Sequence, residues 1–391
     1  MKSKVVLAYS GGLDTSVCIR WFKEAGHPVI AFCADVGQGK DLEPARRRAL
    51  DLGAERVVIR DLRKIFAQKY VLPALKAGAV YEGKYLLATA LSRPLIAKAL
   101  AETARTYKAG VVAHGCTGKG NDQVRLEVSL RIKDPKLKIV APLREWELRS
   151  RQEEVQYLES RNLPVPKKSD SRYSIDQNLW GVSIESGPLE DPWVEPPPEV
   201  YRWTADPQKA PAHAQTVEIE FLRGVPVGLN GRKRPLVDLI QDLNRIGARH
   251  GVGRTDLIED RLVGIKSREI YEAPAATILH SAHRELEHLT LDRETLFFKE
   301  MVAQRYARLI YDGLWFTPLK GALDRFVDST QTNVTGTVRM KLQRGQAAAV
   351  GRRSIHSRYA KALATYEGRD LFDQKAATGF IALWGLPYVQ K

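Results

Sequence analysis

The chain has 391 residues, which is enough to bury a large core and to form two domains, and its formal net charge is +15. No apolar run approaches the roughly 20 residues that a membrane-spanning helix needs, and no apolar signal-peptide region precedes the first predicted strand. The three cysteines, Cys18, Cys33 and Cys116, are too few and too widely spaced for a disulfide framework or a Cys-x-x-Cys metal site. The composition therefore predicts a cytoplasmic protein without a membrane partner.

The excess of positive charge has two interpretations. A net charge of +15 favours a nucleic-acid partner. However, the lysines and arginines are spread along the whole chain, often beside acids as in residues 144–154, and no basic run is interleaved with aromatic residues. Because anionic small molecules are a sufficient reason for a positive cleft, we do not expect nucleic acid to be the substrate.

The first predicted elements are a strand, a glycine turn and a helix. Residues 5–8 form a short apolar run typical of a buried parallel strand, and the amphipathic stretch 14–25 predicts a helix that Gly26 ends. Between them, Gly11 and Gly12 allow the backbone to approach a ligand closely. Because a helix start presents unpaired N–H groups and the positive end of the helix dipole, this turn predicts a phosphate pocket.

The residues of this turn exclude two common nucleotide-binding motifs. A Walker A loop ends in Gly-Lys-Ser/Thr, whereas Leu13-Asp14-Thr15 stands here, and the Gly-x-Gly-x-x-Gly pattern of dinucleotide-binding folds is also absent. An ordinary small-residue turn before a helix remains an alternative.

Further elements alternate along the first part of the chain. Apolar runs predict strands at 28–32, 56–60, 110–113 and 138–141. Helices are expected over 41–52, 61–77 and 91–107, the last broken near its start by Pro94. This alternation implies right-handed crossovers and a doubly wound parallel sheet, whose ligands lie beyond the carboxyl ends of the strands. Three polar loops fall at that edge, at 9–16, 34–39 and 114–122.

Two of the polar segments deserve separate interpretations. The run 114–125 has three glycines in six residues, and its Asp122 can start a helix that places Arg125 one turn later on the same face. It predicts a recognition loop, with a helix cap and a solvated arginine as the alternative. The segment 79–94, with Tyr81 and Tyr85 flanking a glycine, on its own predicts a helix–loop–helix with Tyr85 in the core.

The second half predicts a mixed α+β domain. Residues 164–166 are a plausible boundary, and the proline-rich stretch 192–198 can be neither helix nor central strand. Strands are expected at 217–221, 226–229, 335–342 and 347–351, with a hairpin turn at Asn230-Gly231, and helices at 235–250, 276–290 and 294–312. The apolar end, 376–391, packs either on another subunit or on its own domain. We therefore expect domains at 1–165 and 166–360 and a tail at 361–391.

Several long motifs carry a resemblance to a known family. The loop Ser-Gly-Gly-x-Asp-x-Ser at 10–16 resembles the pyrophosphate loop of the N-type ATP pyrophosphatases, which cleave ATP between its α and β phosphates. The runs 8–16, 78–87 and 114–125 resemble the argininosuccinate synthase family in order and spacing. The resemblance continues through 173–180, 189–193, 251–254 and 264–272, and the runs 114–125 and 264–272 are the most specific to this family.

The resemblance implies a fold and a reaction. The fold would be α/β, with an N-terminal doubly wound parallel-sheet nucleotide-binding domain of the adenine nucleotide α-hydrolase type, a C-terminal α+β synthetase domain and a short tail. The reaction would join citrulline and aspartate with ATP through a citrullyl-adenylate, releasing AMP and pyrophosphate in arginine biosynthesis. ATP would bring Mg²⁺ that keeps water ligands, without a dedicated protein metal site. A cytoplasmic homotetramer is expected.

The resemblance also implies roles for individual residues. The residues that would bind ATP are Ala8, Tyr9, Ser10, Gly11, Gly12, Leu13, Asp14, Thr15, Ser16, Ala34 and Gly115. Those that would bind citrulline are Tyr85, Ala90, Asn121, Arg125, Ser174, Ser183, Glu259 and Tyr271. Those that would bind aspartate are Thr117, Asn121 and Asp122, and the expected catalytic residues are Asp14, Asp122 and Arg125.

The residues themselves support these roles unevenly. The planar guanidinium of Arg125 can bind a carboxylate through two hydrogen bonds, and the negative charge of Glu259 suits an α-ammonium group. From the sequence alone, Glu259 could equally be an acidic residue on the surface. Ser174, Ser183 and Tyr271 have no independent signal. Where the family often carries a serine after the threonine, this chain has Thr89-Ala90, and the missing hydroxyl removes a contact worth about 0.5–1.5 kcal/mol.

Two other function classes remain open from the sequence. One is a tRNA-modifying thiolase or lysidine-forming enzyme, which shares the Ser-Gly-Gly-x-Asp loop and would suit the net charge, although Cys116 has no partner cysteine nearby. The other is a protein that senses ATP without turning it over. Salt-dependent RNA binding would mark the first, and an absence of pyrophosphate release would mark the second.

Overall fold

The computed structural model describes residues 1–391 apart from 1, 40–41, 149, 167–171, 368–370 and 390–391. The predicted start of a helix at Asp41 and the last two residues of the tail lie outside the described residues. Among the residues described, no helix is both long enough and apolar enough to cross a membrane. All three cysteines are free.

The N-terminal part contains the predicted parallel sheet. Its five strands follow the order β3-β2-β1-β4-β5, and every neighbouring pair is parallel. The strands are β1 (Val5–Ala8), β2 (Val29–Asp35), β3 (Arg56–Asp61), β4 (Val111–His114) and β5 (Lys138–Val140). The order reverses between β1 and β4, so the loops that follow these two strands border a crevice at the carboxyl edge. The doubly wound architecture is therefore confirmed.

Helices cover both faces of this sheet. One face packs against α1 (Leu13–Glu24), α2 (Glu43–Asp51) and α7 (Arg151–Glu159), whose apolar side chains share a core with Val5 and Leu7. The other face packs against α5 (Ala88–Thr106) and α6 (Asn121–Lys133), which join a larger core through Val6. Most residues of β1, β2 and β4 are buried from both sides, which explains why these strands form short continuous apolar runs, whereas the edge strands β3 and β5 are more exposed.

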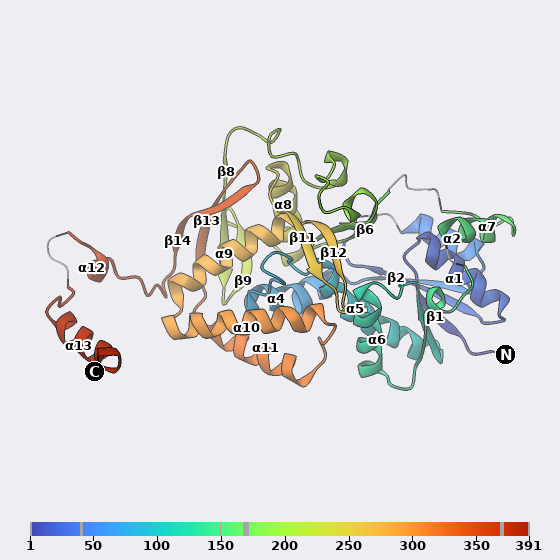
Figure 1. The fold of residues 1–391 in the computed structure, drawn as a ribbon, viewed down its shortest axis with the longest axis horizontal. Helices are drawn as coiled ribbons and strands as arrows, with labels where there is room; N and C mark the ends of the chain where they lie inside the picture. The colour runs from blue at the N-terminus through green and yellow to red at the C-terminus, as the bar shows by residue number, and fades with distance from the viewer. Residues whose placement is uncertain (1, 40–41, 149, 167–171, 368–370, 390–391) are drawn as a thin grey trace.

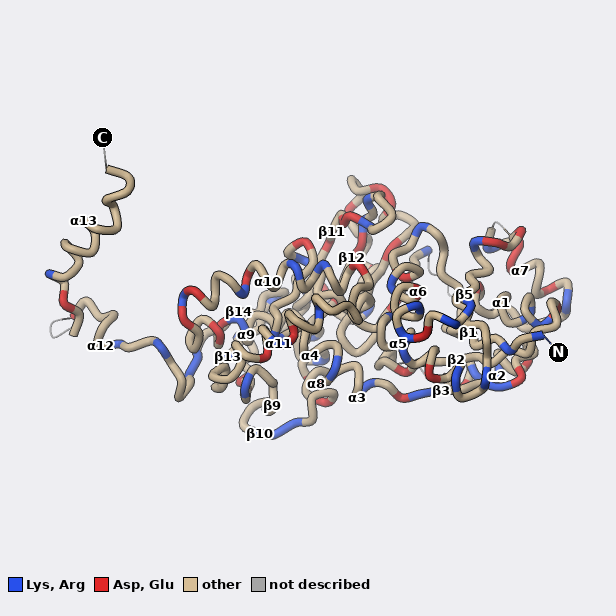
Figure 2. The backbone as a smooth tube through the Cα atoms, turned by 90° about the horizontal axis from the view of Figure 1, so that it is seen from below, with Lys and Arg blue, Asp and Glu red and all other residues tan. Residues whose placement is uncertain are grey.

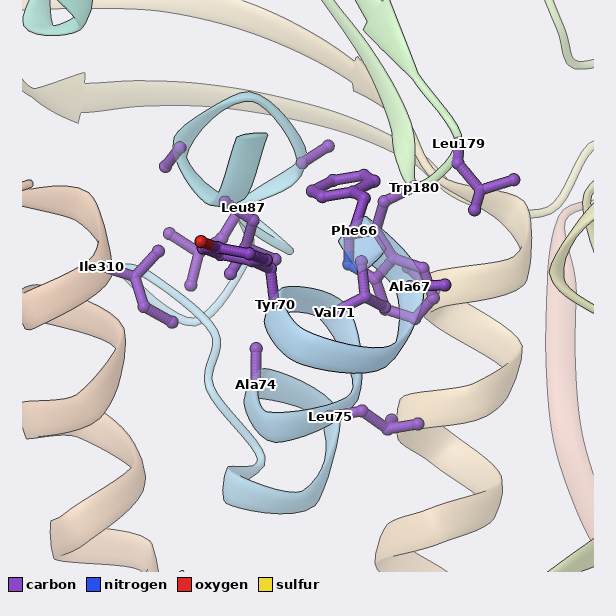
Figure 3. Close-up of a cluster of buried hydrophobic side chains, with 14 of the residues drawn as sticks. Phe66, Ala67, Tyr70, Val71, Ala74, Leu75, Leu87, Leu179, Trp180 and Ile310 are labelled. Atoms are coloured by element: carbon purple, nitrogen blue, oxygen red, sulfur yellow. The ribbon is translucent and has the colours of Figure 1, made fainter. Parts of the chain in front are cut away.

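Two predicted helices differ from the structure. The helix expected at 91–107 begins at Ala88, and Pro94 lies inside it instead of breaking it, because most of this helix is buried and packing outweighs the lost hydrogen bond. The stretch 61–77 is α3 (Arg63–Phe66), a π-helical turn η1 (Ala67–Val71) and α4 (Leu72–Ala77). These helices leave the first domain and pack among helices of the second (Figure 3).

The C-terminal part has two antiparallel sheets. The first has the order β11-β12-β7-β6 and the second the order β10-β9-β8-β13-β14. Their strands are β6 (Ser174–Asn178), β7 (Gly181–Glu185), β8 (Gln215–Leu222), β9 (Val225–Leu229), β10 (Arg232–Lys233), β11 (Arg254–Asp260), β12 (Lys266–Glu272), β13 (Gly336–Gln343) and β14 (Gln346–Arg353). The hairpin turn at Asn230-Gly231 is confirmed, since both residues have the positive φ that such a turn requires.

Helices and short turns complete this part. The helices are α8 (Leu236–Arg249), α9 (Pro274–Thr290), α10 (Arg293–Tyr311), α11 (Pro318–Thr330), α12 (Lys361–Ala364) and α13 (Ala376–Val389), and the 3₁₀ turns are η2 (Pro142–Arg144), η3 (Gly187–Glu190) and η4 (Pro198–Val200). Figure 1 shows α12 and α13 extending away from the body of the molecule. Figure 2 shows Lys and Arg interspersed with Asp and Glu along the body.

One apolar core joins the two parts. Trp180, between β6 and β7, is fully buried, and its indole N–H donates to the Leu86 carbonyl at 3.0 Å. Figure 3 shows Phe66, Tyr70 and Trp180 in this cluster beside Ile310 from α10. Because this core continues from the first domain into the second, elements of both can hold side chains at fixed positions across the crevice.

Candidate active site

The turn after β1 has an open, anion-binding shape. Gly12 is the N-cap of α1, and no side chain caps this helix, so the N–H groups of its first turn are available to an anion. Gly11 has a φ of +78°, and a side chain there would meet Ala45. The Arg48 guanidinium donates to the Gly11 carbonyl at 2.6 Å and fixes the turn from outside.

Hydroxyl groups stabilise the inside of the same turn. The Ser10 hydroxyl accepts from the Gly12 N–H at 3.2 Å and lies 3.1 Å from the Thr15 hydroxyl. The Tyr9 hydroxyl lies 3.3 Å from the Ser16 hydroxyl, and both residues are buried. Leu13 is also buried. Tyr9 and Leu13 therefore stabilise the turn from the core, and only their backbones can face a nucleotide.

The remaining predicted ATP residues lie at the same edge of the sheet. Ala8 ends β1, and Ala34 lies near the end of β2, where its carbonyl accepts from the Gln38 amide at 2.9 Å. Gly115 follows β4, and a Cβ added there would lie 2.7 Å from the methyl carbon of Thr15. The loops after β1 and β4 are thus in direct contact, as the reversal of strand order predicts.

A cavity of 760 Å³ opens beside this pair of loops. Asp14 and Thr117 line it from the first domain, and Ser174 and Arg261 line it from the second. Three predicted site residues with different expected ligands therefore share one space.

Two of the carboxyl groups that line this cavity, those of Asp14 and Glu154, lie next to the phosphate turn. Glu154 on α7 is 7% exposed, and one of its carboxyl oxygens has no hydrogen-bond partner in the described structure. Burial, and then the nearby charge of Asp14, raises the pKa of Glu154 to about 8. The pair is thus an acidic site next to the phosphate turn that the charge of Arg151 offsets only in part, and it would favour a bound cation.

A second charged network surrounds the start of α6. The helix begins at Asn121 after Gly120, so the prediction that Asp122 starts this helix is displaced by one residue. One guanidinium N–H₂ group of Arg93 donates to Asp122 at 2.7 Å and to Asp176 at 2.5 Å. Burial alone would raise the pKa of Asp122, but Arg93 and Arg125 outweigh it and hold this pKa at about 2.

Arg125 is buried, which excludes the solvated-arginine alternative. Its NH1 group donates to Asp122 at 2.9 Å, and its Nε–H donates to the Tyr311 carbonyl at 2.8 Å. Its guanidinium carbon lies 4.6 Å from the centre of the Tyr311 ring. The NH2 group has no hydrogen-bond partner among the described residues. A buried donor left open in this way favours an acceptor from a ligand.

Aromatic residues hold most of the other predicted citrulline residues together. Tyr85 stacks on Tyr271 with ring centres 4.1 Å apart, so Tyr85 belongs both to the core and to the site. The Tyr271 hydroxyl donates to Glu259, which is only 3% exposed and so is not a surface acid. Burial raises the pKa of Glu259, and the hydroxyl groups that donate to it oppose this shift.

The remaining predicted citrulline residues lie at the margins of this cluster. Ser183 on β7 lies 2.8 Å, hydroxyl to hydroxyl, from Thr89, next to Ala90. Ala90 is fully buried, and its N–H donates to the Tyr85 hydroxyl at 3.3 Å. Ser174 on β6 faces the cavity instead.

Sequence reasoning missed three residues that connect these groups. Arg93 and Asp176 form ion pairs at the start of α6, and Tyr311 contacts several predicted site residues at once. Tyr311 is the last residue of an ordinary amphipathic helix, and no sequence motif marks it as a site residue. Arg93 did stand out beside Pro94 in a polar segment, but only the fold shows which carboxylates it meets.

The fold and the site define a class of protein: a doubly wound α/β domain with an uncapped glycine turn at its strand-order reversal, joined to a second domain that lines the same cavity. Family models agree with this class. Residues 4–164 match the model described as the arginosuccinate synthase N-terminal HUP domain, and residues 173–390 match the arginosuccinate synthase C-terminal domain.

Curated relatives extend the match over nearly the whole chain. The argininosuccinate synthase of Rubrobacter xylanophilus is 57% identical over 384 residues, 98% of this chain and 94% of that protein. That of Carboxydothermus hydrogenoformans is 56% identical over 388 residues, 99% of this chain and 97% of that protein. The chain therefore belongs to the argininosuccinate synthase family.

Membership of this family gives the reaction. The enzyme is a ligase that forms a C–N bond, condensing citrulline with aspartate at the expense of ATP through a citrullyl-adenylate and releasing AMP and pyrophosphate. This assignment replaces the tRNA-modifying and ATP-sensing alternatives.

The contact between the two loops generates a prediction. Gly115→Ala places a methyl group 2.7 Å from the Thr15 side chain, so Thr15 and the phosphate turn must shift. We expect the KM for ATP to rise about tenfold, because small displacements of bound groups are costly in catalysis. Initial rates at varied ATP, with citrulline and aspartate saturating, measure this change.

A matched control lies in the same loop. A Cβ added at Gly118 meets nothing within 4 Å, so Gly118→Ala should change the KM for ATP by no more than about twofold. Equal effects of the two substitutions would show that the contact between the loops does not matter.

Proposed function

We propose that ATP, citrulline and aspartate meet at the carboxyl edge of the parallel sheet, each in the residues named for it above. The observation that carries this proposal is the contact of the loops after β1 and β4, marked by Gly115 and Thr15. This contact brings the phosphate turn next to the network of Asp122 and Arg125. The α-phosphorus of an ATP held by the turn would then face the ureido group of a citrulline held by Arg125.

The two chemical steps need position and charge more than acid–base catalysis. In the first, the ureido oxygen of citrulline attacks the α-phosphorus, the P–O bond to the β-phosphate breaks, and pyrophosphate leaves. In the second, the aspartate amine attacks the ureido carbon and AMP leaves. The amide groups at the start of α1 would take up the charge that develops on pyrophosphate. Fixing the reactants in line is worth about 7–11 kcal/mol of barrier.

The residue roles follow from charge and from open hydrogen-bonding groups. The unpartnered NH2 group of Arg125 would bind the citrulline carboxylate, and Glu259 would bind its α-ammonium. Thr117, Asn121 and Asp122 would hold aspartate. With a pKa of about 2, Asp122 stays anionic at neutral pH, so it would orient the incoming amine by its charge instead of removing a proton.

The acidic pair beside the phosphate turn fits a magnesium ion that accompanies ATP. Asp14 and Glu154 line the cavity there, and the unpartnered oxygen of Glu154 suits a hard cation. These two carboxylates would hold Mg²⁺ together with phosphate oxygens and water, whereas the sequence predicts no dedicated protein site for the ion. The ion would neutralise charge on the leaving pyrophosphate.

The reaction is tested by following its products. We expect purified protein with Mg²⁺ to form AMP and pyrophosphate from ATP only when citrulline is present, and argininosuccinate only when aspartate is added. Chromatography of the nucleotides and a coupled pyrophosphate assay measure these products. Formation of ADP, formation of AMP without citrulline, or full activity in excess EDTA would contradict the proposal.

The role of Arg125 gives a second test. Arg125→Ala removes the proposed carboxylate donor, and because hydrogen bonds to charged groups are worth about 1.5–3 kcal/mol, the citrulline KM should rise at least about tenfold. ATP binding should persist by calorimetry. Arg131→Ala, on the same helix and 73% exposed in its side chain, is the control that should leave citrulline binding unchanged. An unchanged citrulline affinity in Arg125→Ala would make the assignment wrong.

We further propose that the tail, residues 361–391, binds other copies of the chain in a homotetramer. It projects from the body, and Phe380 and Trp384 are 62% and 67% exposed, whereas apolar surfaces of this kind are usually covered by a partner (Figure 1).

A cytoplasmic location is proposed because the cysteines are free, and cell fractionation would test it.

Removal of the tail tests the tetramer. A chain ending at residue 360 should sediment as a smaller assembly than the full chain, because the exposed apolar helix α13 is lost. Analytical ultracentrifugation at equal protein concentration measures this. Identical masses for the two chains, or a monomeric full-length chain, would refute the role of the tail.

A further inference from the structure

A chain of hydrogen bonds with a fixed direction runs through the candidate citrulline pocket. It begins at the backbone N–H of Leu262, in the turn between β11 and β12, which donates to Oδ1 of Asn121 at 2.9 Å. A backbone N–H can only donate, so this bond fixes the orientation of the Asn121 amide. The amide NH₂ group then donates to the Tyr311 hydroxyl at 2.8 Å.

The direction continues to a carboxylate. Because the Tyr311 oxygen accepts from Asn121, its own proton is free to donate to Glu259, whose Oε1 lies 2.6 Å away. Tyr271 donates to the other oxygen of Glu259 at 2.5 Å. Both oxygens of Glu259 therefore receive phenol donors, an arrangement that stabilises the anion.

Tyr311 itself is rigidly held. It is the last residue of α10 and is 1% exposed. Its ring lies 3.6 Å from the ring of Tyr81 with an angle of 5° between them, and its carbonyl accepts from Arg125. Gly313 follows with a φ of +75°, and a Cβ there would lie 2.7 Å from the Arg125 Cα. The end of α10 thus packs directly against α6.

We propose that Tyr311 is a positioning residue for citrulline, which orients the amide of Asn121 and the carboxylate of Glu259 at the same time. This inference rests on the proposed citrulline pocket. Tyr311 contacts three of the residues assigned to that pocket, namely Asn121, Arg125 and Glu259. Tyr311 acts through these residues, because its hydroxyl accepts a hydrogen bond from Asn121 and donates one to Glu259, and citrulline would bind to both side chains.

The proposal has a consequence for pH dependence. The groups that act on Glu259 are the phenols Tyr81, Tyr85, Tyr271 and Tyr311, the cations Arg125 and Arg261, and the carboxyl group of Glu269. Burial raises the pKa of Glu259, and the Tyr311 hydroxyl is among the groups that lower it. Without this hydroxyl the pKa rises further, so the anion that binds an ammonium group is lost at a higher pH than in the parent.

The test is Tyr311→Phe, which keeps the ring contacts with Tyr81 and Arg125 and removes only the hydroxyl. We expect the citrulline KM to rise about tenfold, more than kcat falls, and the KM for ATP to change by less than about twofold. The citrulline KM of the variant should also increase as the pH is lowered, and this increase should begin at a higher pH than in the parent. Steady-state kinetics at a series of pH values measures both.

Tyr306→Phe is the matched control. Tyr306 lies on the same helix, is also fully buried, and donates to a carboxylate, Asp324, outside the pocket. It should leave the citrulline KM and its pH profile unchanged. If the two variants behave alike, or if Tyr311→Phe leaves the citrulline KM and its pH profile unchanged, the positioning role is overturned.

Glu259→Gln separates this inference from the pocket on which it rests. If Glu259→Gln raises the citrulline KM and Tyr311→Phe does not, the pocket stands and only the role of Tyr311 fails. If Glu259→Gln itself leaves the citrulline KM unchanged, the assignment of the pocket fails.

Discussion

The reversal of strand order between β1 and β4 is the constraint on which the site depends. The loops after these strands leave the sheet on either side of one crevice, and the close approach of Gly115 to Thr15 brings them into contact. Helices α1 and α6, which follow these loops, therefore both start at the carboxyl edge of the sheet. Their starts differ in chemistry: α1 presents free amides, which suit phosphate, whereas α6 presents Asn121, Asp122 and Arg125, which suit an amino acid.

The second domain completes the pocket because the two domains share one core. The segment from α3 to α4 packs among the helices of the second domain, and Trp180 packs back toward the first (Figure 3). This fixed contact lets Tyr311 and the turn between β11 and β12 each bond to a different atom of the Asn121 amide. Such a pocket requires that the two domains keep a fixed relative position. Closely packed, buried side chains provide this, which explains why many residues of the pocket are buried.

The sequence predicts the parallel sheet well and the second domain only in part. Runs such as residues 5–8 are apolar throughout because both faces are covered, so their strands are evident. The sheet β11-β12-β7-β6 was missed, because strands such as Ser174–Asn178 and Lys266–Glu272 carry the polar residues of the site and lack a clear apolar alternation. Ion pairs such as Arg93 with Asp176 join residues far apart in the chain, and a single sequence does not reveal such pairs.

The charges of the site suit a reaction that needs fixed electrostatics. Two arginines keep Asp122 anionic, whereas burial raises the pKa of Glu259 and the phenol donors oppose this shift. Asp122 is therefore not a proton acceptor near neutral pH, which agrees with a ureido oxygen that attacks phosphorus without prior deprotonation. Glu154 differs, because burial and the charge of Asp14 raise its pKa to about 8. It lies on the cavity wall next to the phosphate turn, where a cation brought by ATP would supply the opposite charge.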